Sequence, residues 1–200
     1  MESKRASIIV LSGGTSSRFG SDKSKALIGA QSLIQRILTS IPAEFEVIIV
    51  GPEPDIQTAT YLCVQENPLG GGPLAGFKAG LAACTSEIVG LIATDMPFAI
   101  THVINLLNAM TSHDDAVIYV DAEGFKQSLA AVYRVEAVEK ALVEIGDVHG
   151  QSMRSLVSHL RVREIAMSSQ AVQALLDIDT QADLKHAIAF SQSLADNSEL

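Results

Sequence analysis

The sequence predicts an α/β protein, a Rossmann-like three-layer α/β/α sandwich around a mostly parallel central sheet. Short β-branched apolar runs recur along the 200 residues, and each is followed by a stretch whose apolar residues recur at spacings of three and four. This alternation is typical of parallel strands joined by covering helices. No stretch resembles a linker, so we expect a single domain over residues 1–195 and a polar, frayed tail over residues 196–200.

The expected strands and helices alternate along the chain, and the mostly parallel sheet leaves room for one antiparallel strand. The expected strands are Ala6–Leu11, Glu46–Val50, Leu62–Gln65, Ile88–Ala93, Ala116–Val120, Ser128–Tyr133 and Val162–Ala166. The expected helices are Ser32–Ser40, Leu74–Ala83, Thr101–Met110, Val135–Ile145, Ser152–His159 and Gln181–Leu194.

Local signals mark some of the boundaries. Thr101 and Thr180 are candidate helix caps, and Asp183 stands three residues after Thr180, as in a capping box. The stretch "DAEGFKQSLAAVYR", residues 121–134, predicts a turn centred on "EG" that leads into a strand. This hairpin either lines the pocket of a second substrate or is a plain surface hairpin, and the pattern leaves both interpretations open.

The charge distribution favours a small anionic ligand over a polymer. The formal net charge is -9, which argues against general affinity for nucleic acid or anionic lipid. Residues 1–30 nevertheless hold five basic and two acidic side chains, whereas the other 170 residues hold 9 basic and 21 acidic ones. The opening loop is therefore a positive spot on an acidic body, and it suits an anion such as a nucleotide.

Other composition signals point to a cytoplasmic protein. Cys63 and Cys84 are too few for a disulfide framework and lack CxxC spacing, so we expect two reduced, largely buried thiols. The five histidines lack metal-ligand spacing. The run "ASIIVL" is shorter than a signal-peptide core, and no segment approaches the ~20 apolar residues of a membrane span.

Three loops that follow predicted strands are candidates for chemistry. In "VLSGGTSSRFGSDKSKAL", residues 10–27, Gly13 and Gly14 permit close backbone approach to phosphate, and Arg18 and Lys23 add positive charge. The stretch "ENPLGGGPLAGFKAGL", residues 66–81, is a second glycine-rich loop, with a proline suited to the first turn of a helix. In "LIATDMPF", Asp95 follows a strand, where a carboxylate facing phosphates suits Mg²⁺.

Joined in chain order, these segments resemble the molybdenum cofactor guanylyltransferases, within the nucleotide-diphospho-sugar-transferase type of fold. "LSGGTSSRFGSDKSKAL" is similar to their LAGGxSxRMGxDK signature, "GGGPLAGFKAGL" to GPLAG, and "ATDMPF" to CDMPF. "QSLAAVYR" resembles their PLxALYR strand and "LLDIDTQADL" their closing NxNTPEDL element. The matches span nearly the whole chain.

The resemblance implies roles for particular residues. Leu11, Ser12 and Gly13 would contact a guanine nucleotide through the backbone, beside Gly14. Arg18 and Lys23 would bind its phosphates and serve catalysis together with Asp95, which would hold Mg²⁺. Lys23 takes the motif lysine because it follows the acid directly, and Lys25 is read as surface charge.

Two departures from the family pattern bear on specificity. The family commonly has a nucleotide-contacting aspartate before GPLAG, and the candidates here are Glu66 and Asn67. An asparagine cannot accept hydrogen bonds from both guanine N1–H and N2–H as a carboxylate can. The family's closing asparagines, which face the acceptor, appear here as Asp177 and Asp179.

The implied reaction transfers GMP from GTP to Mo-molybdopterin, with pyrophosphate released, and it calls for Mg²⁺ and transient contacts with cofactor-biosynthesis or acceptor proteins. The alternatives are a cytidylyltransferase or other nucleotidyltransferase with a different phosphorylated acceptor, a non-catalytic nucleotide-binding regulator, and a plain interaction domain.

Overall fold

The computed structural model describes residues 6–13, 26–56 and 60–198. Within these ranges seven strands form one central sheet in the order β5-β4-β1-β6-β8-β7-β9. They are β1 (Ser7–Leu11), β4 (Glu46–Val50), β5 (Leu62–Val64), β6 (Ile88–Ala93), β7 (Ala116–Val120), β8 (Lys126–Arg134) and β9 (Val162–Ala166). Neighbouring strands are parallel except at β8, which runs antiparallel to both β6 and β7. The mostly parallel sheet with one reversed strand is confirmed.

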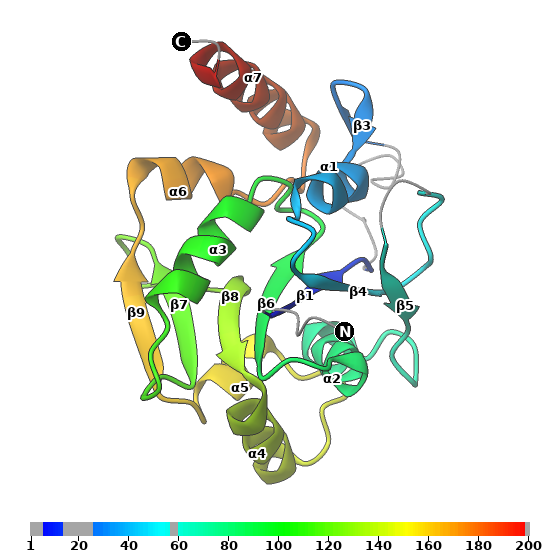
Figure 1. The fold of residues 1–200 in the computed structure, drawn as a ribbon, viewed down its shortest axis with the longest axis vertical. Helices are drawn as coiled ribbons and strands as arrows, with labels where there is room; N and C mark the ends of the chain where they lie inside the picture. Colours follow the sequence, from blue (N-terminus) through cyan, green and yellow to red (C-terminus); the bar gives the residue numbers. More distant parts are fainter. Residues whose placement is uncertain (1–5, 14–25, 57–59, 199–200) are drawn as a thin grey trace.

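Helices cover both faces of this sheet (Figure 1). One face packs against α2 (Gly72–Ala83), α4 (Val135–Ile145) and α5 (Met153–Val157). The other face packs against α1 (Leu33–Ser40), α3 (Ile100–Ala109) and α6 (Ser169–Ala174). The predicted three-layer α/β/α sandwich is therefore confirmed.

Successive side chains of β1 point to opposite faces of the sheet, and both faces are buried. Ile9 packs into the core on the α2 side, whereas its neighbours Ile8 and Val10 pack into the core on the α3 side. All three are fully buried, and each contributes roughly 1.5–3 kcal/mol by leaving water. Continuous apolar runs in the sequence thus correspond to strands covered on both sides.

Several elements differ from the sequence-based expectation. The helix α6 and a small hairpin, β2 (Leu27–Ile28) with β3 (Gln31–Ser32), were not predicted. Such short segments carry too little periodicity to detect. The final helix α7 (Gln181–Ser198) continues past Leu194 into the tail that we expected to be frayed. Thr101 is not a cap, because α3 begins at Ile100 with Ala99 as its N-cap.

The start of α7 matches its sequence signal. Asp183 Oδ2 accepts hydrogen bonds from the main-chain N–H and the hydroxyl of Thr180, at 2.7 and 2.8 Å. In return the Thr180 hydroxyl accepts from the Asp183 N–H at 3.2 Å. The predicted capping box is therefore confirmed, and it satisfies donors that a helix start leaves without partners.

Both cysteines are free, but each is half-buried rather than largely buried. Burial, with a smaller contribution from Glu53, raises the pKa of the Cys63 thiol. The thiol is thus held protonated at neutral pH and is a poor nucleophile. None of the helices in the described ranges combines the length and apolar character needed to cross a bilayer.

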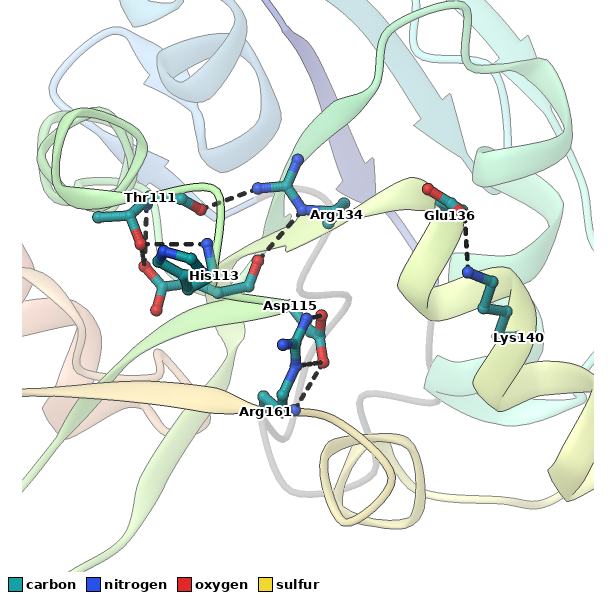
Figure 2. A network of polar contacts seen from close by, with 8 residues as sticks. Thr111, His113, Asp115, Arg134, Glu136, Lys140 and Arg161 are labelled. Atoms are coloured by element: carbon teal, nitrogen blue, oxygen red, sulfur yellow. Dashed lines mark hydrogen bonds and ion pairs between the residues drawn. The ribbon is translucent and has the colours of Figure 1, made fainter.

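A polar network ties together the amino ends of β7 and β9 (Figure 2). Asp115 accepts two hydrogen bonds from the Arg161 guanidinium, at 2.7 and 2.9 Å, and one from the Arg161 main-chain N–H at 3.0 Å. Arg134 donates to the carbonyl oxygens of Thr111 and Asp114. These contacts link the starts of β7 and β9 and the end of β8 to the segment that follows α3, and they stabilise the packing of these elements.

Candidate functional site

The strand order places a topological switch point at the carboxyl ends of β1 and β6. The chain passes from β1 outward to β4 and β5, and then returns to β6 on the other side of β1. Ligands of open α/β sheets bind at such a switch point. Leu11, the last residue of β1, is paired with Ala93, the last residue of β6.

The turn that carries Asp95 is anchored by hydrogen bonds to the end of β1 and to the segment before α7. Thr94, directly before it, donates from its main-chain N–H and from its hydroxyl to the Leu11 carbonyl, at 3.0 and 2.5 Å. The Asp95 carbonyl accepts from the Ile178 N–H at 3.0 Å. Asp95 is half-buried. The end of β1, the Asp95 turn and the segment before α7 therefore meet at one place.

Gly51, which the sequence analysis did not single out, is required at this edge. Its φ is +134°, and a Cβ there would lie 1.7 Å from the Ser12 carbonyl oxygen. The Ser12 N–H donates to the Val50 carbonyl at 2.7 Å. Only glycine fits this conformation and this contact. A glycine directly after an apolar strand was the available signal.

The second glycine-rich loop leads into α2 at the same edge. The helix begins at Gly72, and Pro73 stands in its first turn as predicted. A Cβ on Gly76 would lie 3.4 Å from Leu11 Cδ2, so α2 packs closely against the end of β1. Glu66 Oε1 accepts from the Gly70 N–H at 3.1 Å, whereas Asn67 is exposed. The carboxylate of Glu66 thus stabilises its own turn, and Asn67 is exposed to solvent in the loop after β5.

The structure brings together only part of the predicted site. Leu11, Ser12, Gly13 and Asp95 lie along the ends of β1 and β6, and Asn67 lies in the loop after β5. Gly14, Arg18 and Lys23 lie outside the described residues, as does Lys25.

Asp177 and Asp179 lie on either side of Ile178, whose buried side chain packs with Ala26 and Leu33. Because the Ile178 N–H also bonds the Asp95 carbonyl, the two acidic residues lie next to the Asp95 turn. The closing segment of the sequence is thus part of the candidate site.

The donor chemistry of the site fits Mg²⁺ held largely by substrate. Within the described part of the chain, no group of three His, Cys, Asp or Glu side chains is arranged to hold a metal. Mg²⁺ in phosphate sites commonly takes one or two carboxylates and completes its shell with phosphate oxygens and water. Asp95, two residues after the end of β6, offers one such carboxylate, which fits that arrangement.

Comparison with known proteins identifies the family. The model of the MobA-like NTP transferase domain matches residues 8–165. A probable molybdenum cofactor guanylyltransferase of Bacillus mycoides is 32% identical over 179 residues, covering 84% of this chain and 86% of the relative. A relative with the same name in Bacillus anthracis is 30% identical over 177 residues, with the same coverage.

Solved structures share the fold. Molybdopterin-guanine dinucleotide biosynthesis protein A from Archaeoglobus fulgidus matches with a TM-score of 0.72 and 20% identity, covering 94% of this chain and 99% of that one. The 2-C-methyl-D-erythritol 4-phosphate cytidylyltransferase from Thermus thermophilus matches with a TM-score of 0.69 and 15% identity, covering 94% and 98%. The expected nucleotidyltransferase fold is confirmed, and the chain belongs to the MobA-like NTP transferase family.

Proposed function

We propose that this chain transfers GMP from GTP to Mo-molybdopterin, giving the guanine dinucleotide cofactor and pyrophosphate. The names of its curated relatives support this reaction. The structural observation that carries the proposal is the junction of the Leu11 carbonyl, the Asp95 turn and Ile178 at the switch point of the sheet. A nucleotide and a second substrate can meet there.

The nucleotide would bind over the first loop. The Leu11 carbonyl and the Ser12 N–H already make internal hydrogen bonds, so the main-chain contacts begin at Gly13 and Gly14. The Ser12 side chain would add a hydroxyl contact. Arg18 and Lys23 would bind the phosphates, since charge-assisted hydrogen bonds to phosphate are about twice as strong as neutral ones.

Asp95 would hold Mg²⁺, which when bound neutralises phosphate charge and orients the nucleotide. The hydrogen bonds from Thr94 to the Leu11 carbonyl hold the main chain directly before Asp95. The hydrogen bond from the Ile178 N–H holds the carbonyl of Asp95 itself. This prearranged carboxylate does not need to reorganise during the reaction.

The reaction needs positioning more than covalent participation by the protein. The terminal phosphate oxygen of the acceptor attacks the α-phosphorus of GTP, and the bond from that phosphorus to the bridging oxygen of pyrophosphate breaks. Lys23 and Arg18 would stabilise the negative charge that builds on the leaving pyrophosphate.

We further propose that the protein works in the reducing cytoplasm, with transient contacts to cofactor-biosynthesis or acceptor proteins. The net charge of -9 opposes nucleic-acid binding.

Pyrophosphate release tests the proposal. GTP, CTP, ATP and UTP are each combined with Mo-molybdopterin and with other phosphorylated acceptors. We expect release with GTP and Mo-molybdopterin. A preference for CTP would instead identify a cytidylyltransferase, and GTP binding without release under any acceptor would identify a regulator.

A further inference from the structure

Phe125 is an exposed aromatic ring on a well-defined turn. It lies at the tip of the hairpin that joins β7 to β8, and it is 56% exposed. Asp121 Oδ1 accepts from the Phe125 N–H at 2.7 Å, and the Asp121 N–H donates to the Phe125 carbonyl at 3.1 Å. Gly124, with φ of +84°, completes the turn. These contacts therefore hold the backbone of Phe125 in a defined turn.

The strand register places this tip at the edge that carries Asp95. Ala130 of β8 is paired with Ile92, one residue before the end of β6. Because β8 runs antiparallel to β6, the start of β8 and the hairpin tip lie at that same end of the sheet. A register shift between β7 and β8 pairs Lys126 with Val120, so the tip begins about level with the end of β6. An acceptor whose phosphate lies near Asp95 could therefore extend along this edge of the sheet to Phe125.

A second set of contacts links the tip to the glycine-rich loop before α2. The Gly150 N–H donates to the Gly71 carbonyl at 2.8 Å. Three residues later α5 begins, and the Arg154 guanidinium lies 5.4 Å from the centre of the Phe125 ring. The segment from Gly150 to Arg154 thus bridges the loop and the ring. Two independent lines of geometry place Phe125 at the rim of the candidate site.

We infer that Phe125 binds the acceptor substrate by stacking on its flat heteroaromatic ring. Arg154 covers one side of the phenyl ring, and the exposure of Phe125 leaves room for a planar ligand against it. Stacking suits a ligand with a planar ring at one end and a phosphate at the other, because the ring is held without matched hydrogen bonds. Arg154 adds positive charge beside the stack. This inference rests on the proposed function, since it names a residue that binds the acceptor of that reaction.

The variant Phe125→Ala tests the inference through separate Michaelis constants. We expect the KM for the acceptor to rise about tenfold, as loss of one aromatic stacking partner does, while the KM for GTP stays within about twofold. Phe125→Trp should restore the acceptor KM, and Phe125→Leu, which keeps apolar volume without a ring, should not. Val143→Ala is the matched control, because Val143 is 82% exposed on α4.

Direct binding separates this inference from the proposed reaction. Isothermal titration calorimetry of the protein with Mo-molybdopterin, in the absence of GTP, should give an affinity about tenfold lower for Phe125→Ala and a normal affinity for Val143→Ala. An unchanged affinity and an unchanged acceptor KM in a folded Phe125→Ala protein would overturn the inference. If wild-type protein released no pyrophosphate, the proposed reaction would fail, but the calorimetric titration would still decide the role of Phe125.

Discussion

Among single residues, Asp95 and Lys23 have the most demanding roles in the proposed chemistry. We predict that Asp95→Asn or Lys23→Ala lowers kcat by roughly 10²–10³, because each removes one prearranged charge from the transition state. Initial rates of pyrophosphate release measure this effect. Lys25→Ala is the control, since Lys25 is read as surface charge, and its rate should match wild type. A rate within about threefold of wild type for either site variant would refute that assignment.

Gly51 and Gly13 are a contrasting pair of glycines. A Cβ on Gly51 would overlap the Ser12 carbonyl oxygen, whereas a Cβ on Gly13 meets no described atom within 4 Å. We predict that Gly51→Ala costs at least about 1–3 kcal/mol of stability, from the positive φ alone. Gly13→Ala should keep the wild-type stability but bind GTP more weakly. Chemical denaturation and nucleotide titration distinguish the two effects, and a wild-type stability for Gly51→Ala would contradict the described backbone.

Between elements, the contact of Asp115 with Arg161 joins the starts of β7 and β9. Hydrogen bonds from Arg161 lower the pKa of Asp115 below its ordinary value. A carboxylate whose pKa is lower in the folded state stabilises the fold above its unfolded pKa of ~3.9, and this contribution is lost as the pH falls through the folded pKa. Asp115→Asn should therefore reduce stability at pH 7, by about 1–2 kcal/mol because Arg161 is mostly exposed.

The pH dependence of that difference is the measurement. The stabilities of wild type and Asp115→Asn, obtained by urea denaturation, should converge as the pH falls below about 4. Glu136→Gln is the control, because Glu136 and Lys140 form an exposed pair at 2.6 Å within one helix, and its loss should leave the stability close to that of wild type at every pH. If the difference in stability between wild type and Asp115→Asn did not change with pH, the charge of Asp115 would not be its cause.

Element boundaries follow the sequence where local chemistry decides them. The Thr180 and Asp183 pair marks the start of α7, and Pro73 marks the first turn of α2. By contrast, α6 depends on Ser168 as its cap and on burial of Ala171 against the sheet face. Six residues with one cap carry no clear periodicity, so only packing shows that this helix forms.

For the molecule as a whole, nucleotide binding should appear as increased thermal stability. At a ligand concentration 100 times Kd, binding adds about 2.7 kcal/mol, which for a domain of this size raises Tm by roughly 5–10 °C. We expect GTP with Mg²⁺ to give the largest shift among the four nucleotides, and Lys23→Ala to lose most of it. Absence of a shift with any nucleotide would favour a plain interaction domain.

The sequence by itself determined the fold class and most strands and helices, and it located the strand ends from which the candidate loops start. These features are local, since apolar periodicity, glycines and caps act within a few residues. Only the tertiary structure decided which distant segments meet. It joined Leu11 to Thr94, Asp95 to Ile178 and Phe125 to Arg154, and it showed that Gly51 must lack a side chain beside Ser12. Such contacts depend on strand order and register, which no short stretch of sequence encodes.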